Sequence, residues 1–125
     1  MEPSDLLLDV SVPYEGWSFG DIELRNWDLF SGNQPPHETA DDVLSRGLQF
    51  LTLVRRTHAQ TEVAAVTHGD VIAFLMLWAR GTPFQPEGRL PLYRQYLGTR
   101  SITTLSFAGT EAEERPTVDS VRPEW

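Results

Sequence analysis

Hydrophobic positions recur at helical spacing in the middle of the chain. Five apolar residues between positions 39 and 57 fall on one face of a helix: Val43, Leu44, Leu48, Leu51 and Val54. Thr39 precedes this run, and Asp42 follows Thr39 by three residues, a pair typical of a capping box. The pattern predicts an amphipathic helix over residues 39–57.

A second hydrophobic pattern joins a strand to a helix. Residues 62–67 are almost continuously small and apolar, which predicts a strand buried on both faces. The apolar run 71–79 predicts a helix that ends at Gly81. The four residues 67–70, Thr-His-Gly-Asp, then form a tight turn between the two elements, with Asp70 as the expected cap of the helix.

Shorter patterns occupy the two ends of the chain. The stretches that predict further strands are residues 6–12, 101–107 and 118–121. Glycines, prolines and aromatic residues punctuate residues 14–36, which predicts a long loop with a short helix around residues 22–30. This order of elements predicts an α/β fold, a three-layer α/β/α sandwich, in a single domain over residues 1–125.

Composition narrows the class of protein. The chain has 125 residues, no cysteine and a net charge of -8, so disulfides and thiolate metal sites are excluded. Its longest apolar run is far below the ~20 residues that cross a bilayer, and its acidic start is unlike a signal peptide. A cytoplasmic protein without a membrane partner is expected. Scattered arginines on an acidic chain also argue against a nucleic-acid partner.

The turn at His68 and Gly69 has the features of an anion site. A strand that ends here places the imidazole at the carboxyl edge of a sheet, beside helix N–H groups that attract anions. Gly69 lets the backbone approach such an anion closely. A surface histidine in an ordinary turn is the alternative reading of the same four residues.

Several segments, in this order, resemble the histidine phosphatase superfamily, which has the phosphoglycerate-mutase-like fold. Residues 15–23 resemble the segment in which a catalytic acid precedes an aromatic-glycine pair. Residues 35–39, Pro-Pro-His-Glu-Thr, are similar to the start of the helix before the second catalytic histidine. Residues 63–72 closely resemble the strand, second histidine, glycine turn and helix of that family, and residues 101–105 resemble its next strand.

The resemblance implies a phosphatase or mutase-like enzyme that acts on phosphorylated small molecules through a phosphohistidine, without a metal or an organic cofactor. It implies that His68 stabilises the transferred phosphoryl group and that Glu15 is the proton donor. Glu23, or no acid at all, is the alternative to Glu15, because the family's usual position for the acid is Gly16 here. The residues expected to bind substrate are Gly69, Ser101 and Arg25.

The chain departs from the family in one central respect. The family's nucleophilic histidine lies in an Arg-His-Gly motif on the first strand, whereas the three histidines here lie in Pro-His-Glu, Thr-His-Ala and Thr-His-Gly. A second phosphate-binding arginine of the family is also absent. The chain therefore looks like an N-terminally truncated domain whose first two strands are missing, and we expect it to be inactive by itself.

Loss of a central strand has a structural consequence. Unpaired buried backbone groups each cost about 1–3 kcal/mol, so the remaining sheet is expected to pair again, directly or through a homodimer. The alternative function is a non-catalytic, degenerate phosphatase fold, a pseudoenzyme that serves as an anion-binding or dimerisation module. No metal site is expected, because no two histidines have the i, i+4 spacing of helical ligands.

Overall fold

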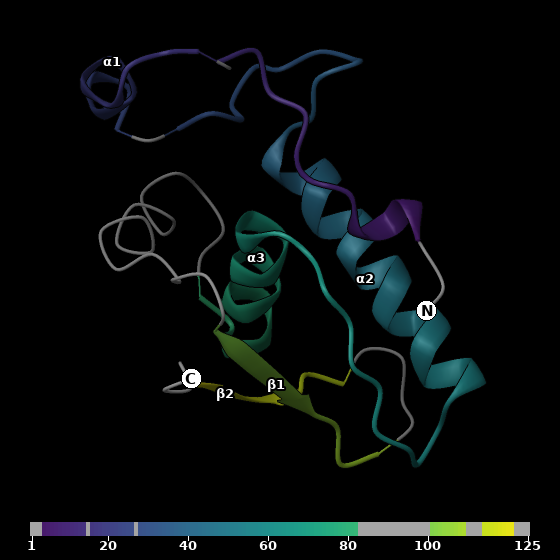
Figure 1. Ribbon diagram of the computed structural model, residues 1–125. Helices are drawn as coiled ribbons and strands as arrows, with labels where there is room; N and C mark the ends of the chain where they lie inside the picture. The colour runs from purple at the N-terminus through teal and green to yellow at the C-terminus, as the bar shows by residue number, and fades with distance from the viewer. Residues whose placement is uncertain (1–3, 15, 27, 83–100, 110–113, 122–125) are drawn as a thin grey trace.

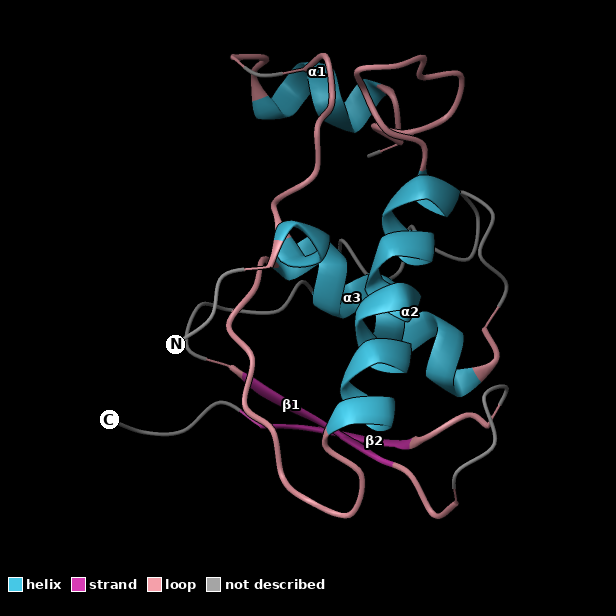
Figure 2. Cartoon of the chain, turned by 90° about the vertical axis from the view of Figure 1, so that its right-hand side faces the viewer, coloured by secondary structure: helices cyan, strands magenta, loops and turns pink. Residues whose placement is uncertain are grey.

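The computed structural model describes residues 4–14, 16–26, 28–82, 101–109 and 114–121 (Figure 1). Its elements are the 3-10 helix η1 (Asp5–Leu7), the helices α1 (Phe19–Leu24), α2 (Ala40–Thr57) and α3 (Gly69–Arg80), and the strands β1 (Ile102–Ser106) and β2 (Thr117–Val121). Helices α2 and α3 pack against each other, and α1 lies beyond the N-terminal end of α2 (Figures 1 and 2). The described part thus combines helices with a small sheet, as expected for an α/β fold.

Helix α2 begins with the predicted capping box. The Thr39 hydroxyl accepts a hydrogen bond of 3.2 Å from the Asp42 N–H, and the Asp42 carboxylate accepts one of 2.9 Å from the Thr39 N–H. Arg55 and Arg56 lie in the last turn, where positive charge is favourable. The predicted helix over residues 39–57 is confirmed.

Helix α3 begins two residues earlier than predicted. Its N-cap is His68, and Asp70 is the second helical residue. The prediction that Asp70 caps the helix is therefore wrong. Gly81 ends the helix with a φ of 68°, in the left-handed region that glycine adopts without strain. The rest of the prediction for residues 71–81 is confirmed.

The hydrophobic core lies between α2, α3 and the loop that precedes α2. Its buried members are Phe30, Ala40, Val43, Val71, Phe74, Leu75 and Leu77. The rings of Phe30 and Phe74 pack edge to face at 5.2 Å. Gly47 of α2 permits the close approach of α3, because a Cβ there would lie 3.2 Å from a methyl carbon of Leu75.

The described strands form one antiparallel pair. Ile102 pairs with Val121 and Ser106 with Thr117, which confirms the strands predicted over residues 101–107 and 118–121. Helix α3 contacts this sheet, and the Thr103 hydroxyl lies 3.8 Å from Sδ of Met76.

The prediction of a buried strand over residues 62–67 is wrong. This segment has no regular structure, and Val63 and Val66 are 46% and 88% exposed. Strand structure requires a neighbour for its backbone groups, and within the described ranges β1 and β2 pair only with each other. The apolar pattern is therefore present without the partner that would bury it.

Two further predictions near the N-terminus are also wrong. Residues 6–12 form no strand, because residues 5–7 turn into η1 and the carbonyl groups that follow bond to a side chain of α2. The short helix expected at residues 22–30 forms earlier, over Phe19–Leu24, because the Ser18 hydroxyl caps it by accepting from the Asp21 N–H at 3.2 Å.

Candidate functional site

His68 lies at the N-cap of α3. Its backbone is extended (φ -100°, ψ 159°), its carbonyl accepts from the Ile72 N–H at 3.2 Å, and its imidazole makes no capping hydrogen bond. The N–H groups of the first helical turn, beginning with Gly69, have no acceptor within the helix. A half-exposed imidazole and the positive end of a helix dipole are thus adjacent, an arrangement that attracts anions.

The residues before α3 contact the N-terminal segment of the chain. Nδ1 of His68 lies 3.6 Å from Oδ2 of Asp9, and the Thr67 hydroxyl donates to the Leu7 carbonyl at 2.8 Å. Both side chains of the first contact are more than half exposed, at 53% and 62%. A contact this exposed contributes little to the stability of the fold.

A guanidinium from α2 holds this N-terminal segment in place. Arg46 donates to the carbonyl groups of Leu6 at 3.0 Å, Leu8 at 2.6 Å and Asp9 at 3.2 Å. It also forms two contacts with the Glu38 carboxylate, Nε–Oε2 at 2.7 Å and Nη2–Oε1 at 3.1 Å. The planar, five-donor geometry of arginine suits such a set of acceptors.

Glu38 also contacts the N-terminal segment, and Arg46 and Glu38 together are called the clamp below. Its carboxylate accepts from the Ser11 N–H at 3.0 Å, and its own N–H donates to the Ser11 carbonyl at 2.7 Å. The hydrogen bond from Arg46 lowers the pKa of Glu38 below its usual value, and this effect outweighs the opposing effect of burial. Glu38 is therefore a carboxylate at neutral pH, and its role is structural rather than that of a proton donor.

The structure places the predicted site residues in different parts of the chain. Gly69 directly follows His68 as the first residue of α3. Arg25 lies at the C-cap of α1, with its guanidinium 4.6 Å from the centre of the Tyr14 ring, and Ser101 precedes β1. Glu15 lies outside the described residues. No hydrogen bond or ion pair in the described part of the chain joins His68 to Arg25 or Ser101, so their substrate contacts stay predictions.

The roles of Glu38 and Arg46 were not predicted from the sequence. The signal available was a glutamate just before the N-cap of a predicted helix and an arginine eight residues later. Such spacing is compatible with a contact across the first helical turns, but the carbonyl partners of Arg46 lie 37 to 40 positions away in sequence. Only the tertiary structure reveals them.

The described ranges contain neither a cluster of metal ligands nor a membrane-spanning helix. No three histidine, aspartate or glutamate side chains there are grouped so as to hold a metal ion. None of the helices in these ranges combines the length and apolar character needed to cross a membrane.

Comparison with known proteins identifies the family. Neither the curated proteins nor the solved structures include a match. The family model of the histidine phosphatase superfamily (branch 1) matches residues 14–117, which include α1, α2, α3 and β1. Because this match covers most of the chain and includes the turn at His68, the chain belongs to the histidine phosphatase superfamily.

Proposed function

We propose that this chain is the C-terminal part of a phosphomonoesterase domain, a three-layer α/β/α sandwich, that acts through a phosphohistidine. The observation that carries this proposal is the family match together with the position of His68 at the N-cap of α3, the positive end of the helix dipole. In the intact domain, a histidine outside these 125 residues attacks phosphorus and the bond to the alcohol oxygen breaks. Water then hydrolyses the phosphohistidine, or a second alcohol accepts the phosphoryl group.

The proposed role of His68 is electrostatic. Its imidazole hydrogen-bonds a phosphoryl oxygen and offsets the negative charge that develops in the transition state. Gly69 brings a backbone N–H to the same group, while Ser101 and Arg25 contact the substrate. Glu15 protonates the leaving oxygen and later activates water.

The exposed apolar segment 62–67 supports the proposal of a truncated domain. In this chain Val63 and Val66 are in contact with solvent although their sequence has the composition of a buried parallel strand. A neighbouring strand that ends in the nucleophilic histidine would pair with this segment and bring the two histidines to the same sheet edge. We therefore propose that the isolated chain, which lacks that strand, is inactive.

One observation favours the non-catalytic alternative. The segment Val63-Ala64-Ala65-Val66 reads the same in both directions, so antiparallel pairing of two copies places valine opposite valine across a two-fold axis. A degenerate phosphatase fold that dimerises in this way, or binds anions weakly at His68, is the second candidate. Such a homodimer is the alternative means of pairing the exposed segment.

Hydrolysis of p-nitrophenyl phosphate tests the first proposal. The chain alone should show negligible turnover, whereas the product extended by the coding sequence in frame upstream should be active. In that product His68→Asn should lower kcat by about 10²–10³-fold, as loss of a transition-state hydrogen-bond donor does. The matched control His58→Asn alters an exposed histidine at the end of α2 and should retain activity.

Two results decide against the proposal. Robust turnover by the 125-residue chain, abolished by His68→Ala, shows that no external nucleophile is needed. An inactive extended product that binds phosphate or vanadate at about millimolar strength in calorimetry, as few-contact sites do, supports the non-catalytic anion-binding module instead.

A further inference from the structure

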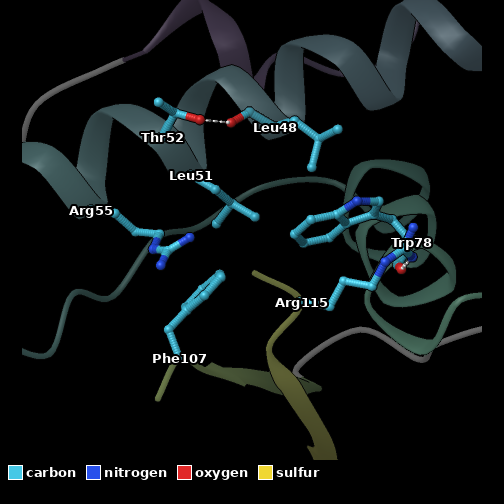
Figure 3. A pocket seen from close by; sticks show the side chains of 7 residues that line it. All are labelled: Leu48, Leu51, Thr52, Arg55, Trp78, Phe107 and Arg115. Atoms are coloured by element: carbon cyan, nitrogen blue, oxygen red, sulfur yellow. Dashed lines mark hydrogen bonds between the residues drawn. The ribbon is translucent and has the colours of Figure 1, made fainter. Parts of the chain in front are cut away.

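A cavity lies near the C-terminal end of α3, away from His68 at the N-cap of that helix. It has a volume of about 430 Å³, is open to solvent on one side, and lies between α2, α3 and the chain segments that flank the two strands (Figure 3). Its volume is within the range of small-molecule pockets. The side chains that matter for its chemistry are Leu48, Leu51, Arg55, Trp78, Phe107 and Arg115.

Part of the cavity wall is apolar, and the rest is polar. Figure 3 shows the rings of Trp78 and Phe107 and the side chain of Leu51 directed toward the same space. Aromatic rings offer large planar surfaces that favour offset or edge-to-face packing with another ring. The apolar part of the wall therefore suits a planar apolar group.

The two arginines of the cavity differ in their partners. Arg55 is neutralised by Glu114 at 3.0 Å, donates to the Gly109 carbonyl at 3.1 Å, and lies 4.1 Å above the Phe107 ring. Arg115 donates to the Trp78 carbonyl and lies 5.7 Å from the centre of the Trp78 ring. Among the described residues no carboxylate lies within ion-pair distance of Arg115.

We infer that this cavity binds a small organic anion with a planar aromatic body. The acid group of the ligand pairs with the guanidinium of Arg115, which has N–H donors to spare after its bond to the backbone. The ring of the ligand packs against Trp78, Phe107 and Leu51. A carboxylate or phosphate without a ring gains only the first of these contacts.

This site is separate from the proposed phosphoryl site. His68 is the N-cap of α3, and Trp78 lies in the same helix ten residues later. This separation corresponds to about 15 Å along the helix axis. The inference therefore does not depend on the proposed function, and a failure of one leaves the other intact.

Titration of the 125-residue chain with 2-naphthoate tests the inference, followed by the indole N–H signals in ¹H–¹⁵N spectra. Trp78→Phe assigns the signal of Trp78 among the four tryptophans. We expect a saturable shift of the Trp78 signal with a Kd of about 1 mM or below. Two control ligands each lack one feature: 2-naphthamide has the ring without the charge, and inorganic phosphate has the charge without the ring. Each should bind at least about tenfold more weakly than 2-naphthoate, a loss equal to ~1.4 kcal/mol.

Variants locate the acid-binding group. Arg115→Gln should weaken 2-naphthoate binding about tenfold and leave 2-naphthamide binding unchanged, since only the charge is lost. The matched control Arg56→Gln removes the same charge from α2 outside the cavity, and should leave both affinities unchanged. Arg115→Lys keeps the charge without the planar fork and should bind with intermediate affinity, which preserves the test if Arg115→Gln does not fold.

Three outcomes overturn the inference. The first is equal affinity for 2-naphthoate and 2-naphthamide, which removes the role of the charge. The second is an Arg115→Gln variant that binds 2-naphthoate as Arg56→Gln does. The third is the absence of a saturable shift at Trp78 up to about 20 mM, well above the expected Kd.

Discussion

Glu38 and Arg46 form a two-contact ion pair, with Nε–Oε2 at 2.7 Å and Nη2–Oε1 at 3.1 Å. The same guanidinium bonds three carbonyl groups of the N-terminal segment, and that segment brings Asp9 to His68. The side chains of Arg46 and Glu38 are only 15% and 20% exposed, so water screens the pair less than it screens a surface ion pair. The surroundings of His68 therefore depend on a contact at the start of α2.

Arg46→Met should lower the free energy of unfolding by about 2–3 kcal/mol. The substitution leaves the Glu38 carboxylate and three backbone carbonyls without their donor, and the loss of one partner of a shielded pair is costly. Urea unfolding followed by circular dichroism measures the change. Arg56→Met, on the exposed side of the same helix, should change stability by less than about 0.5 kcal/mol. Equal effects of the two substitutions would show that the clamp contributes nothing.

The stability of the chain should fall in acid in a way that depends on Glu38. Its folded pKa is lowered from 4.5, so the folded state binds fewer protons than the unfolded state. The contribution is complete above the unfolded value and is lost as the pH falls from about 4.5 through the lowered folded pKa.

Unfolding of the wild type and of Glu38→Gln between pH 7 and 3 measures this contribution. The other carboxylates titrate in both proteins, so the difference between the two curves isolates Glu38. The wild type should be the more stable at pH 7, and the difference should shrink below pH 4.5, the usual value for this side chain. A difference that is constant with pH contradicts the lowered pKa.

Two threonine substitutions, one at the start and one in the middle of α2, should change the free energy of unfolding in opposite directions. Thr39→Ala removes the N-cap hydroxyl and should cost about 1 kcal/mol. Thr52→Ala replaces an exposed mid-helix threonine by a better helix former and should stabilise by a few tenths of a kcal/mol. Thermal unfolding of both variants is sufficient, and two shifts of the same sign would contradict the capping box.

Val66→Thr should distinguish this chain from the proposed intact domain. Val66 is 88% exposed here, so the substitution should change stability by less than about 0.5 kcal/mol. In the extended product the same valine is proposed to be buried in a central strand, where an added hydroxyl should cost about 1–3 kcal/mol. Val71→Thr is the control, because Val71 is 1% exposed and should be destabilised in both proteins. Equal responses of Val66→Thr in the two proteins contradict the proposed strand.

Local signals in the sequence were sufficient for the long helices. Thr39 and Asp42 cap α2 through contacts three residues apart, and Gly81 ends α3 through its own backbone conformation. Such features depend on neighbours within one or two turns, so the sequence contains all the information needed. The position of His68 at the beginning of α3 was predicted in the same way. Its role as the N-cap was not, because Asp70 was expected to be the cap.

Strands and the clamp around Arg46 depend on distant partners. The composition of residues 62–67 is that of a buried strand, but burial requires a neighbour, and among the described residues none pairs with it. Residues 6–12 likewise have a strand-like pattern, yet their carbonyl groups bond to Arg46 about 40 positions away. Neither result follows from local pattern alone.

The proposal that the nucleophilic histidine lies outside this chain is tested most simply by reading the coding sequence in frame upstream of the Met1 codon. We predict an apolar strand that ends in Arg-His-Gly, because the nucleophilic histidine is proposed to lie outside these 125 residues. That result would supply the nucleophilic histidine that the proposed function requires. An in-frame stop codon with no Arg-His-Gly before Met1 would contradict the claim and leave the non-catalytic module as the function of the chain.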